Sequence, residues 1–330
     1  MKLPPDDPLT AVVLFNLGGP DTLDDVKPFL RNLFSDPEVI PLPSPLRRLL
    51  AWWIATRRAP TARGYYAQIG GGSPLRRHTE AQAAALEKAL SAAGAYKVVI
   101  AMRYWKPDTD DAVTALAAAR PHRVVLLPLY PQYSFATTRS SLGHFRAVWT
   151  RRGATDVPVR SIDHWYDHPV YLDALVERIV ETRATMPEGD GSPVHLVCSA
   201  HGLPLKLIKQ GDPYQRQVEE QVRLLAARLP EWAAAPERVH LGYQSRVGRA
   251  KWLEPSTESL LHELGGQGVT RVLVVPLSFV SDHSETLYEI DILYRQLAAQ
   301  AGIKIFARMA SLNDSPTFVR ALADLVQRAR

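Results

Sequence analysis

Two stretches of the sequence decide the fold: VVLLPLYPQYS at residues 124–134 and VLVVPLSFVSD at residues 272–282. Each is a run of aliphatic residues followed by a proline and a polar segment, a pattern typical of a buried strand that leaves a parallel sheet. The second stretch begins 148 positions after the first, and five residues recur at that spacing. They are Pro107, Thr109, Pro128, Leu129 and Thr138, matched by Pro255, Thr257, Pro276, Leu277 and Thr286. We therefore predict an internal duplication.

A second pair of segments extends the repeat toward the N-terminus. LFNLGGP at residues 14–20 resembles VCSAHGLP at residues 197–204, with an offset of 184 when Pro20 and Pro204 are matched. The two offsets differ by 36 positions, so the first half carries an insertion of that length between Pro20 and Pro107.

Short β-branched runs alternate with amphipathic segments along the chain, which indicates parallel sheets covered by helices. Further buried strands are expected at residues 11–15, 98–102, 194–198 and 239–242, and helices at residues 79–93, 170–182 and 213–229. The predicted fold is α/β, with two similar doubly wound, Rossmann-like lobes that hold parallel four-stranded sheets and a central cleft. The lobes are expected at residues 1–160, with an inserted lip at about 40–76, and at residues 161–330, whose last helix packs on the first lobe or on its own.

Ligands of open parallel sheets bind outside the carboxyl ends of the strands. The loops after Phe15, Leu129, Cys198 and Leu277 are therefore expected to converge on one cleft.

Composition limits the classes of function. The formal net charge is +5, but the arginines are scattered among Leu and Ala. Nucleic acid is therefore not the expected partner, and an anionic ligand or a membrane surface fits better.

Cys198 is the only cysteine, which excludes an intrachain disulfide and an all-cysteine cluster. Residues 1–10 do not resemble a signal peptide, and no apolar run reaches the roughly 20 residues that span a bilayer. We expect a cytoplasmic protein that is soluble or peripheral.

The inserted segment at residues 44–63, SPLRRLLAWWIATRRAPTAR, sets Trp52 and Trp53 among arginines. Such a segment suits a helix in a membrane interface. It also suits a surface helix whose tryptophans pack on the domain, or an apolar lip for a flat ligand, and all three interpretations stay open.

Two strand exits carry ionisable residues. His201 follows the strand expected at residues 194–198, where an imidazole can accept protons or bind a metal, or simply be satisfied by the loop backbone. After the strand at residues 272–277, Glu285 and Glu289 lie one helical turn apart, with Asp282 suited to cap the helix. A histidine facing a carboxylate stripe suits ferrous iron, although cobalt, nickel and zinc are also admissible. The HExxH and GxSxG motifs of zinc hydrolases and serine hydrolases are absent from the sequence.

Aromatic residues gather in two segments, MRYWKP at residues 102–107 and YPQYSFATT at residues 130–138. Beside Arg103 and Ser134 they would suit a planar aromatic acid, whereas core packing is the usual fate of residues such as Tyr104.

These segments together resemble the ferrochelatase family over essentially the whole chain. The matching segments, in order, are LFNLGGPDTLDDVKPFLRNLFSDP, YAQIGGGSPL, MRYWKP, LPLYPQYSFATTRSSL, SAHGLP, GDPYQRQVEE, YQSRVGRAKWLEP and PLSFVSDHSETLYEID. The resemblance implies an enzyme that inserts ferrous iron into protoporphyrin IX to form protohaem, the terminal step of haem biosynthesis.

The resemblance also implies a site. His201 and Glu285 would face each other across a slot for the macrocycle, one from each lobe, and Glu289 and Asp291 would continue an acidic route. His201 would accept pyrrole protons or, with Glu285 and Glu289, bind the iron. The residues implied to line the macrocycle are Leu17, where many relatives have methionine, Arg103, which would hold propionates, Tyr104, Tyr130, Tyr133 and Ser134.

The family resemblance further implies a chain without a permanently bound cofactor or the C-terminal iron–sulfur cluster of some relatives, working as a monomer. Contact with the inner membrane through residues 44–63 is one of the open interpretations. The alternatives are another tetrapyrrole chelatase that acts on cobalt or a more carboxylated ring, coproporphyrin included, and a two-lobed binding protein for haem or metal. A nucleotide-dependent enzyme is disfavoured because residues 16–20 lack a dinucleotide fingerprint and Asp21 would repel phosphate.

Overall fold

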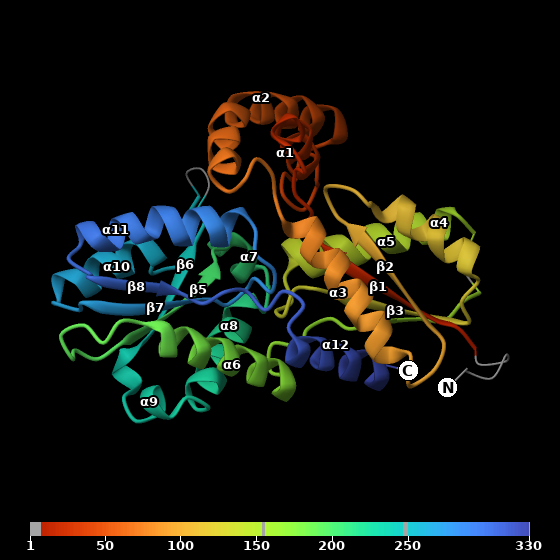
Figure 1. Ribbon diagram of the computed structural model, residues 1–330. Helices are drawn as coiled ribbons and strands as arrows, with labels where there is room; N and C mark the ends of the chain where they lie inside the picture. The colour runs from red at the N-terminus through yellow and green to blue at the C-terminus, as the bar shows by residue number, and fades with distance from the viewer. Residues whose placement is uncertain (1–7, 154–155, 247–249, 330) are drawn as a thin grey trace. The chain divides into compact units, whose positions relative to one another are not determined.

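The computed structural model describes residues 8–153, 156–246 and 250–329. The chain divides into two compact units. Unit 1 comprises Met1–His164 and Asn313–Arg330, and unit 2 comprises Trp165–Leu312. Each unit is built around its own four-stranded parallel sheet (Figure 1).

Unit 1 holds the first four strands and most of the N-terminal helices. Its strands are β1 (Thr10–Asn16), β2 (Tyr96–Met102), β3 (Arg123–Pro128) and β4 (Val159–Ser161), in the order β2-β1-β3-β4. Its helices are the 3₁₀-helix η1 (Leu23–Asp25), α1 (Val26–Phe34), α2 (Ser44–Gln68), α3 (Leu75–Leu90), α4 (Thr109–Ala119), the π-helix η2 (Phe135–Arg139), α5 (Ser140–Arg151) and α12 (Pro316–Arg328).

Unit 2 repeats this plan. Its strands are β5 (His195–His201), β6 (Val239–Gln244), β7 (Arg271–Pro276) and β8 (Ile305–Arg308), in the order β6-β5-β7-β8. Its helices are α6 (Pro169–Thr185), α7 (Leu205–Lys209), α8 (Tyr214–Ala226), α9 (Pro230–Ala233), the 3₁₀-helix η3 (Pro236–Arg238), α10 (Thr257–Gly266), the π-helix η4 (Glu285–Tyr294) and α11 (Arg295–Gln300).

The strand register bears out both sequence offsets. Phe15 of β1 pairs with Pro128 of β3, and Ser199 of β5 pairs with Pro276 of β7. The 184-residue offset therefore relates β1 to β5, and the 148-residue offset relates β3 to β7. Strand order is the same in the two sheets, so the predicted fold class of two similar doubly wound halves is confirmed.

The edge strands β4 and β8 were not among the expected strands. They are only three and four residues long, and their segments are partly exposed, so they lack the continuous apolar run that reveals a central strand.

In unit 1 the sheet is covered on both faces. Alternate residues of β1, namely Ala11, Val13 and Phe15, belong to a buried cluster with side chains of α4 and α5. On the other face, Asn16 donates from Nδ2 to Oγ1 of Thr79 on α3 at 3.0 Å. Helix α12 packs against α3 (Figure 1). The C-terminal helix is thus part of unit 1 rather than of unit 2.

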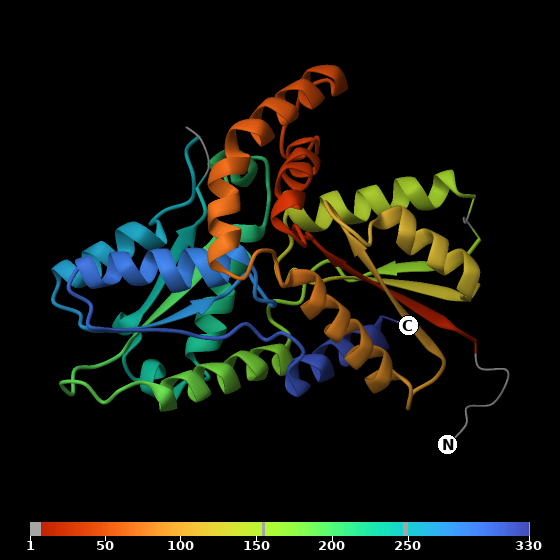
Figure 2. The ribbon, with the colours of Figure 1, turned by 45° about the horizontal axis from the view of Figure 1, so that its top comes forward.

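Helices α1 and α2 form an arm of unit 1, and their buried side chains belong to a cluster that also includes Tyr104. Ala51, Ala55 and Ala59 recur every four residues along α2 and are buried against α1. Small side chains at this spacing let the two helices approach closely. Pro60 lies inside α2, which changes direction along its length (Figure 2).

In unit 2 the apolar side chains of α10, η4 and α11 pack together with those of β7 in one buried cluster. Leu261, Ile290 and Ala298 are fully buried members from the three helical segments. Helices α6 and α8 contact each other and the sheet strands (Figure 1). Because helices cover both faces of this sheet, the sequences of β5 and β7 are continuous apolar runs.

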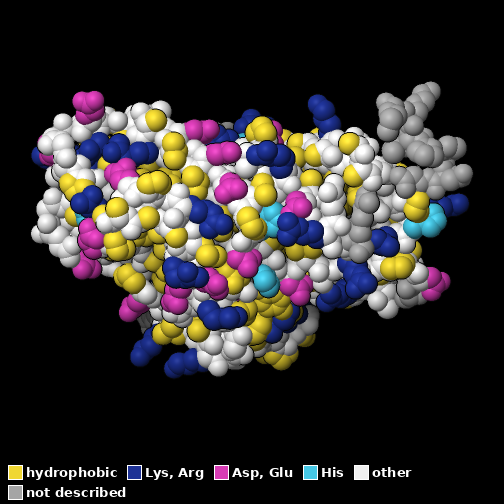
Figure 3. Space-filling model, turned by 90° about the horizontal axis from the view of Figure 1, so that it is seen from below, with side chains coloured by type: hydrophobic (Ala, Val, Ile, Leu, Met, Phe, Trp, Pro, Cys, Tyr) yellow, Lys and Arg dark blue, Asp and Glu magenta, His cyan; other side chains and the backbone are white. Residues whose placement is uncertain are grey.

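The surface carries mixed charge. Basic and acidic side chains are interspersed over the face drawn in Figure 3. Among the residues that the structure describes, no helix has both the length and the apolar character needed to cross a membrane.

Candidate functional site

The candidate site residues of unit 2, His201, Glu285 and Glu289, lie near the carboxyl ends of its parallel strands. His201 is the last residue of β5 and pairs in register with Gln244, the last residue of β6. Ser245 follows directly, and Ser278 lies just beyond the end of β7. These residues therefore lie at the carboxyl edge of the sheet, where ligands of open parallel sheets bind.

His201 contacts Glu285 directly. Nδ1 of His201 lies 2.9 Å from Oε2 of Glu285, and the two side chains are 35% and 29% exposed. The sequence analysis expected them to face each other from different lobes across a slot for the macrocycle. That expectation is wrong, since both residues belong to unit 2 and their polar atoms touch. The two side chains therefore form one hydrogen-bonded pair within unit 2.

The backbone of His201 is held by two hydroxyl groups. The phenol of Tyr214 donates to the carbonyl oxygen of His201 at 2.8 Å and lies 2.7 Å from Oγ of Ser278. The His201 backbone N–H donates to Oγ of Ser278 at 3.3 Å. The ring of Phe279 stands edge-on to the imidazole, with centroids 6.1 Å apart. These contacts fix the position of the imidazole at the strand end.

Glu285 and Glu289 lie on η4, which is a π-helix rather than an α-helix. Single π-turns occur frequently at functional sites, and here the π-helix carries both acidic residues. Asp282 was expected to cap this helix. Instead, Ser284 immediately precedes it, while Oδ1 of Asp282 accepts from the hydroxyl of Thr286 at 3.0 Å and from Arg308 at 2.9 Å.

Glu289 is held by several donors. Oε1 accepts from the backbone N–H of Ser245 at 2.9 Å and from the phenol of Tyr294 at 2.7 Å. Oε2 lies 2.5 Å from Oγ of Ser245 and 3.4 Å from Nε2 of Gln244. Oγ of Ser245 is also 3.2 Å from Oε2 of Glu285. Ser245 therefore touches both carboxylates.

Each member of the pair favours the charged form of the other. Burial lowers the pKa of His201, but the charge and hydrogen bond of Glu285, with the charge of Glu289, outweigh it and raise that pKa. For Glu285, burial raises the pKa, yet interactions dominated by His201 bring it down to about 2. Burial and the neighbouring charge of Glu285 raise the pKa of Glu289. Of the two carboxyl groups, Glu289 is thus the one that protonates more readily.

The predicted iron ligands His201, Glu285 and Glu289 are not arranged as a three-ligand metal site. Within the described ranges, no three His, Cys, Asp or Glu side chains are arranged as a ready metal site. Imidazole nitrogen and carboxylate oxygen nevertheless suit a divalent first-row metal.

The remaining predicted site residues belong to unit 1, and Arg103 among them is engaged by a buried acid. Its Nη2 lies 2.8 Å from Oδ2 of Asp36, whose side chain is fully buried. The same carboxylate accepts from the hydroxyls of Tyr104 at 2.8 Å and Ser140 at 2.6 Å. Burial and the charge of Asp36 raise the pKa of Tyr104 well above its ordinary value.

The other four predicted site residues of unit 1 differ in how exposed their side chains are. Tyr130 is buried in the sheet core, with its hydroxyl 3.3 Å from Oγ of Ser141. Ser134 is also buried and precedes η2, where its Oγ accepts from the N–H of Ala136 at 3.2 Å. Leu17 and Tyr133 are only partly buried. Of these four, Leu17 and Tyr133 are the ones whose side chains remain accessible.

Ser245 and Asp36 were missed by the sequence analysis. The strand-exit rule was applied to four strands but not to the strand at 239–242, whose exit carries Ser245. Asp291, implied as part of an acidic route, lies 2.7 Å from Nη2 of Arg295 and 2.6 Å from Nε of Arg308. Its charge is therefore neutralised by two guanidinium groups.

Comparison with known proteins adds the family. The ferrochelatase family model matches residues 9–330. A ferrochelatase of Gloeothece citriformis is 48% identical over 320 residues, covering 96% of this chain and 81% of that protein. A ferrochelatase of Geotalea uraniireducens is also 48% identical over 320 residues, covering 97% of each chain.

Solved structures share the fold at low identity. SirB from Bacillus subtilis, solved with Fe³⁺, has a TM-score of 0.54 at 13% identity, over 97% of this chain and 95% of that one. CbiX, described as the terminal enzyme of siroheme biosynthesis in denitrifying bacteria, has a TM-score of 0.50 at 15% identity, over 97% and 99%. These likenesses concern the architecture alone. The near full-length matches at 48% identity show that the chain belongs to the ferrochelatase family, the enzymes that insert iron into porphyrin in haem synthesis.

Proposed function

We propose that this ferrochelatase inserts ferrous iron into protoporphyrin IX, and that His201 and Glu285 perform the reaction as one unit. The contact between their polar atoms, at 2.9 Å, is the observation that carries the proposal. Iron and porphyrin react with the loss of two pyrrole protons, so the site needs a base and a place for a cation. A neighbouring imidazole and carboxylate supply both.

The charges of the pair suggest an order of events. At rest, the carboxylate of Glu285 stabilises a protonated His201, as the raised pKa of His201 indicates. Fe²⁺ that reaches the carboxylate brings positive charge next to the imidazolium, which lowers the pKa of His201 and releases its proton. The neutral imidazole then ligates the iron or accepts a proton from a pyrrole nitrogen. Glu289, whose pKa is raised, takes up protons behind the pair.

The proposed porphyrin pocket keeps the six residues implied by the family resemblance, with different roles. Leu17 and Tyr133, the partly buried members, would contact the macrocycle. Arg103 would support the pocket through Asp36, because its guanidinium already forms an ion pair there. The buried side chains of Tyr104, Tyr130 and Ser134 would hold the pocket walls from behind.

An anaerobic assay tests this function. Purified protein is mixed with protoporphyrin IX and ferrous salt, and the absorbance bands of free-base and metallated porphyrin are followed. The wild type should metallate many equivalents of porphyrin per chain, whereas a binding protein would stop at one. His201→Ala should lower the rate by about 10²-fold or more while porphyrin binding persists.

His195→Ala is the matched control, because it makes the same substitution at the first residue of the same strand. It should retain the wild-type rate. Full activity of His201→Ala would remove the proposed mechanism. Parallel runs with coproporphyrin and with Co²⁺ compare the substrate alternatives.

We also propose that the arm of unit 1 contacts the cytoplasmic surface of the inner membrane. Helix α2 buries its alanines and exposes its large apolar side chains. Leu46, Leu49, Trp52 and Trp53 are 58%, 64%, 48% and 51% exposed. About half of the surface of Trp52 and Trp53 is therefore available to a membrane.

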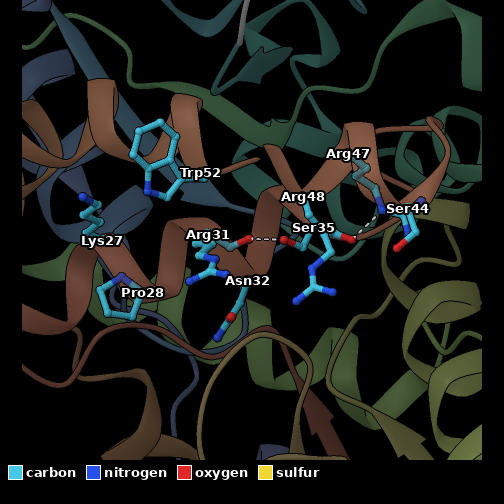
Figure 4. Close-up of a pocket in the computed structure, with 9 residues that line it drawn as sticks. All are labelled: Lys27, Pro28, Arg31, Asn32, Ser35, Ser44, Arg47, Arg48 and Trp52. Carbon is cyan, nitrogen blue, oxygen red and sulfur yellow. Dashed lines mark hydrogen bonds between the residues drawn. The ribbon is translucent and has the colours of Figure 1, made fainter. Parts of the chain in front are cut away.

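A basic pocket adjoins these side chains. It has a volume of about 650 Å³ and is lined by residues of α1 and α2 (Figure 4). Lys27, Arg31, Arg47 and Arg48 contribute positive charge, and none of the nine lining residues is acidic. Nζ of Lys27 lies 6.0 Å from the centre of the Trp52 ring. Tryptophan beside basic groups suits an anionic membrane interface.

Vesicle flotation tests the contact. The protein should float with vesicles that contain phosphatidylglycerol and stay behind with pure phosphatidylcholine. Trp52→Ala with Trp53→Ala should abolish flotation, whereas Val180→Ala, an exposed apolar residue of α6 in unit 2, should not. Flotation that survives the tryptophan changes would contradict the proposal. The proposed state is otherwise a monomer in the cytoplasm without a resident cofactor.

A further inference from the structure

We propose that the pocket between α1 and α2 is a phosphate-binding site, with Arg31 and Arg48 as its principal ligands. The inference rests on the proposed membrane contact of the arm and names the chemical group that the arm recognises. None of the nine residues that line the pocket belongs to the candidate iron or porphyrin sites (Figure 4). The pocket is therefore a separate site within unit 1.

The lining residues lie on one face of each helix. Lys27 and Arg31 are four positions apart on α1, and Ser44, Arg48 and Trp52 follow one another at the same interval on α2. Residues four apart on a helix are neighbours on its surface. Each helix therefore presents one row of polar and basic side chains to the pocket.

Two contacts show that these rows face each other with the helices antiparallel. At one end, Nζ of Lys27 lies 6.0 Å from the centre of the Trp52 ring. At the other end, Nε of Arg47 donates to the carbonyl oxygen of Ser35 at 2.8 Å. Nη1 of Arg47 also donates to the carbonyl oxygen of Leu42 at 2.6 Å, so this guanidinium holds the backbone at the pocket's end.

Three cationic side chains around the pocket have no counter-charge. Lys27, Arg31 and Arg48 are exposed, and none of them is paired with a carboxylate in the part of the chain that the structure describes. Asp24 and Glu38, which flank α1 in the sequence, instead pair with arginines outside the pocket. Like charges four residues apart, as at Lys27 and Arg31, destabilise a helix. A bound anion would remove this repulsion.

A phosphate group suits the arrangement better than a carboxylate. Arg31 and Arg48 reach the pocket from different helices. The oxygens of a phosphate are directed away from one another in three dimensions, so guanidinium groups on two sides can bind it at once. The two oxygens of a carboxylate lie in one plane, which suits a single guanidinium. Ser44, the first residue of α2, adds the positive end of the helix dipole to the site.

Two sources can supply this group, the headgroup of an acidic phospholipid and a free phosphate ester. The neighbouring side chains favour the lipid. Trp52 lines the pocket and is 48% exposed, and Leu46 and Leu49 of the same helix are 58% and 64% exposed. Apolar side chains beside basic ones are what a helix in a membrane interface requires. A phosphate in the pocket would thus belong to a lipid whose acyl chains contact these apolar side chains.

Charge-removing substitutions test the two ligands. Arg31→Gln, Arg48→Gln and the double variant remove positive charge and keep long polar side chains. Arg57→Gln is the matched control, because Arg57 is another exposed arginine of α2 but does not line the pocket. Its guanidinium lies 5.3 Å from the centre of the Trp53 ring. Circular dichroism and thermal melting of each variant establish that it is folded.

The first measurement is equilibrium binding to sedimented vesicles of phosphatidylcholine with phosphatidylglycerol. Arg31→Gln and Arg48→Gln should each weaken binding about 10-fold or more, as loss of a hydrogen-bonded charge does. Arg57→Gln should weaken it at most about 5-fold, the effect of one basic residue near an anionic surface. Equal losses in all three variants would show that only diffuse attraction operates, and would overturn the pocket as the lipid site.

The second measurement is a ³¹P NMR titration of glycerol 3-phosphate and of inorganic phosphate with the protein. Shifting or broadening of the resonance that the double variant abolishes and Arg57→Gln retains would support a site that also accepts free phosphate. Its persistence in the double variant would overturn the assigned ligands. Acetate at equal ionic strength should not displace the phosphate. Displacement by acetate would overturn the preference for phosphate.

Comparison with the tryptophan variants keeps this inference apart from the proposed membrane contact. Vesicle binding that is lost in Trp52→Ala with Trp53→Ala, but undiminished in the arginine double variant without any ³¹P signal, would reject the phosphate site and retain the contact. Vesicle binding that survives the tryptophan changes, with a ³¹P signal that depends on both arginines, would reject the contact and retain the site for a free ester. Iron insertion is judged separately, by turnover of the wild type without vesicles.

Discussion

Nη2 of Arg103 lies 2.8 Å from Oδ2 of Asp36, a carboxylate with no exposed surface. The hydroxyls of Tyr104 and Ser140 and the backbone N–H of Glu38 also donate to this carboxylate. The ion pair joins the segment that ends α1 to the segment that follows β2, 67 positions later in the sequence. A buried ion pair of this kind is expensive to break from one side, because the remaining charge stays in the interior.

Asp36→Asn should therefore destabilise the protein. The substitution keeps the shape of the side chain and leaves Arg103 without its counter-charge, at an expected cost of about 3–5 kcal/mol. Urea unfolding followed by circular dichroism measures the change. Asp24→Asn is the matched control, since Asp24 pairs with Arg63 but its side chain is 91% exposed. That change should cost at most about 1 kcal/mol, and equal effects of the two would contradict the argument.

Glu285→Gln should move the acid limb of the pH–rate profile to lower pH. Iron insertion needs the neutral imidazole, and the wild-type pKa of His201 is raised by Glu285 above its ordinary value near 6.5. Loss of that charge leaves burial as the main influence, which lowers the pKa. The residual metallation rate of the variant, measured anaerobically from pH 5 to 9, should therefore decline at a lower pH than the wild-type rate. A limb that stays in place would show that another group controls it.

Gly72→Ala should destabilise unit 1, whereas Gly64→Ala should not. A Cβ at Gly72 would lie 2.1 Å from the carbonyl oxygen of Asp21, so the backbone must shift. The expected cost is about 1–3 kcal/mol. At Gly64, within α2, a Cβ would meet nothing within 4 Å. There alanine should stabilise by about 0.5–1 kcal/mol through helix propensity. Thermal melting of the two variants is the measurement, and similar shifts would contradict the close approach at Gly72.

Cys198 should resist thiol reagents in the folded protein. It lies inside β5 with no exposed surface, and burial raises the pKa of its thiol to about 12. The thiolate is the reactive form, so almost none is present at pH 8. Ellman's reagent should detect no thiol in the native state and one thiol per chain in guanidinium chloride. Rapid labelling of the native protein would mean that the strand opens.

The central strands and the repeat could be predicted from sequence because buried parallel strands consist of unbroken runs of aliphatic residues. The residues 124–127 and 272–275 are fully buried in the structure, as their composition indicated. The link between His201 and the acidic helix came from the strand-exit rule together with the family resemblance. The strand-exit rule is local, and the resemblance links the two segments although they are 84 positions apart.

The contacts that decide the chemistry were not predictable in the same way. Ser245 contacts Glu285 and Glu289 from a left-handed backbone conformation, and a serine gives no sequence signal for that conformation. The ion pair of Asp36 with Arg103 joins segments distant in sequence, and many other acids could have been its partner. The slot expected between His201 and Glu285 was wrong because sequence indicates which strand ends are functional, but not whether their side chains touch.

The register that relates β1 to β5 places Leu17 of unit 1 where unit 2 has His201. The same correspondence, through β3 and β7, sets Thr137 against Glu285. Unit 1 thus carries a leucine and a threonine at the positions where unit 2 carries the base His201 and the acid Glu285. Two halves with the same strand order therefore present different chemistry at their strand ends, so the shared architecture does not by itself dictate which half bears the reactive groups.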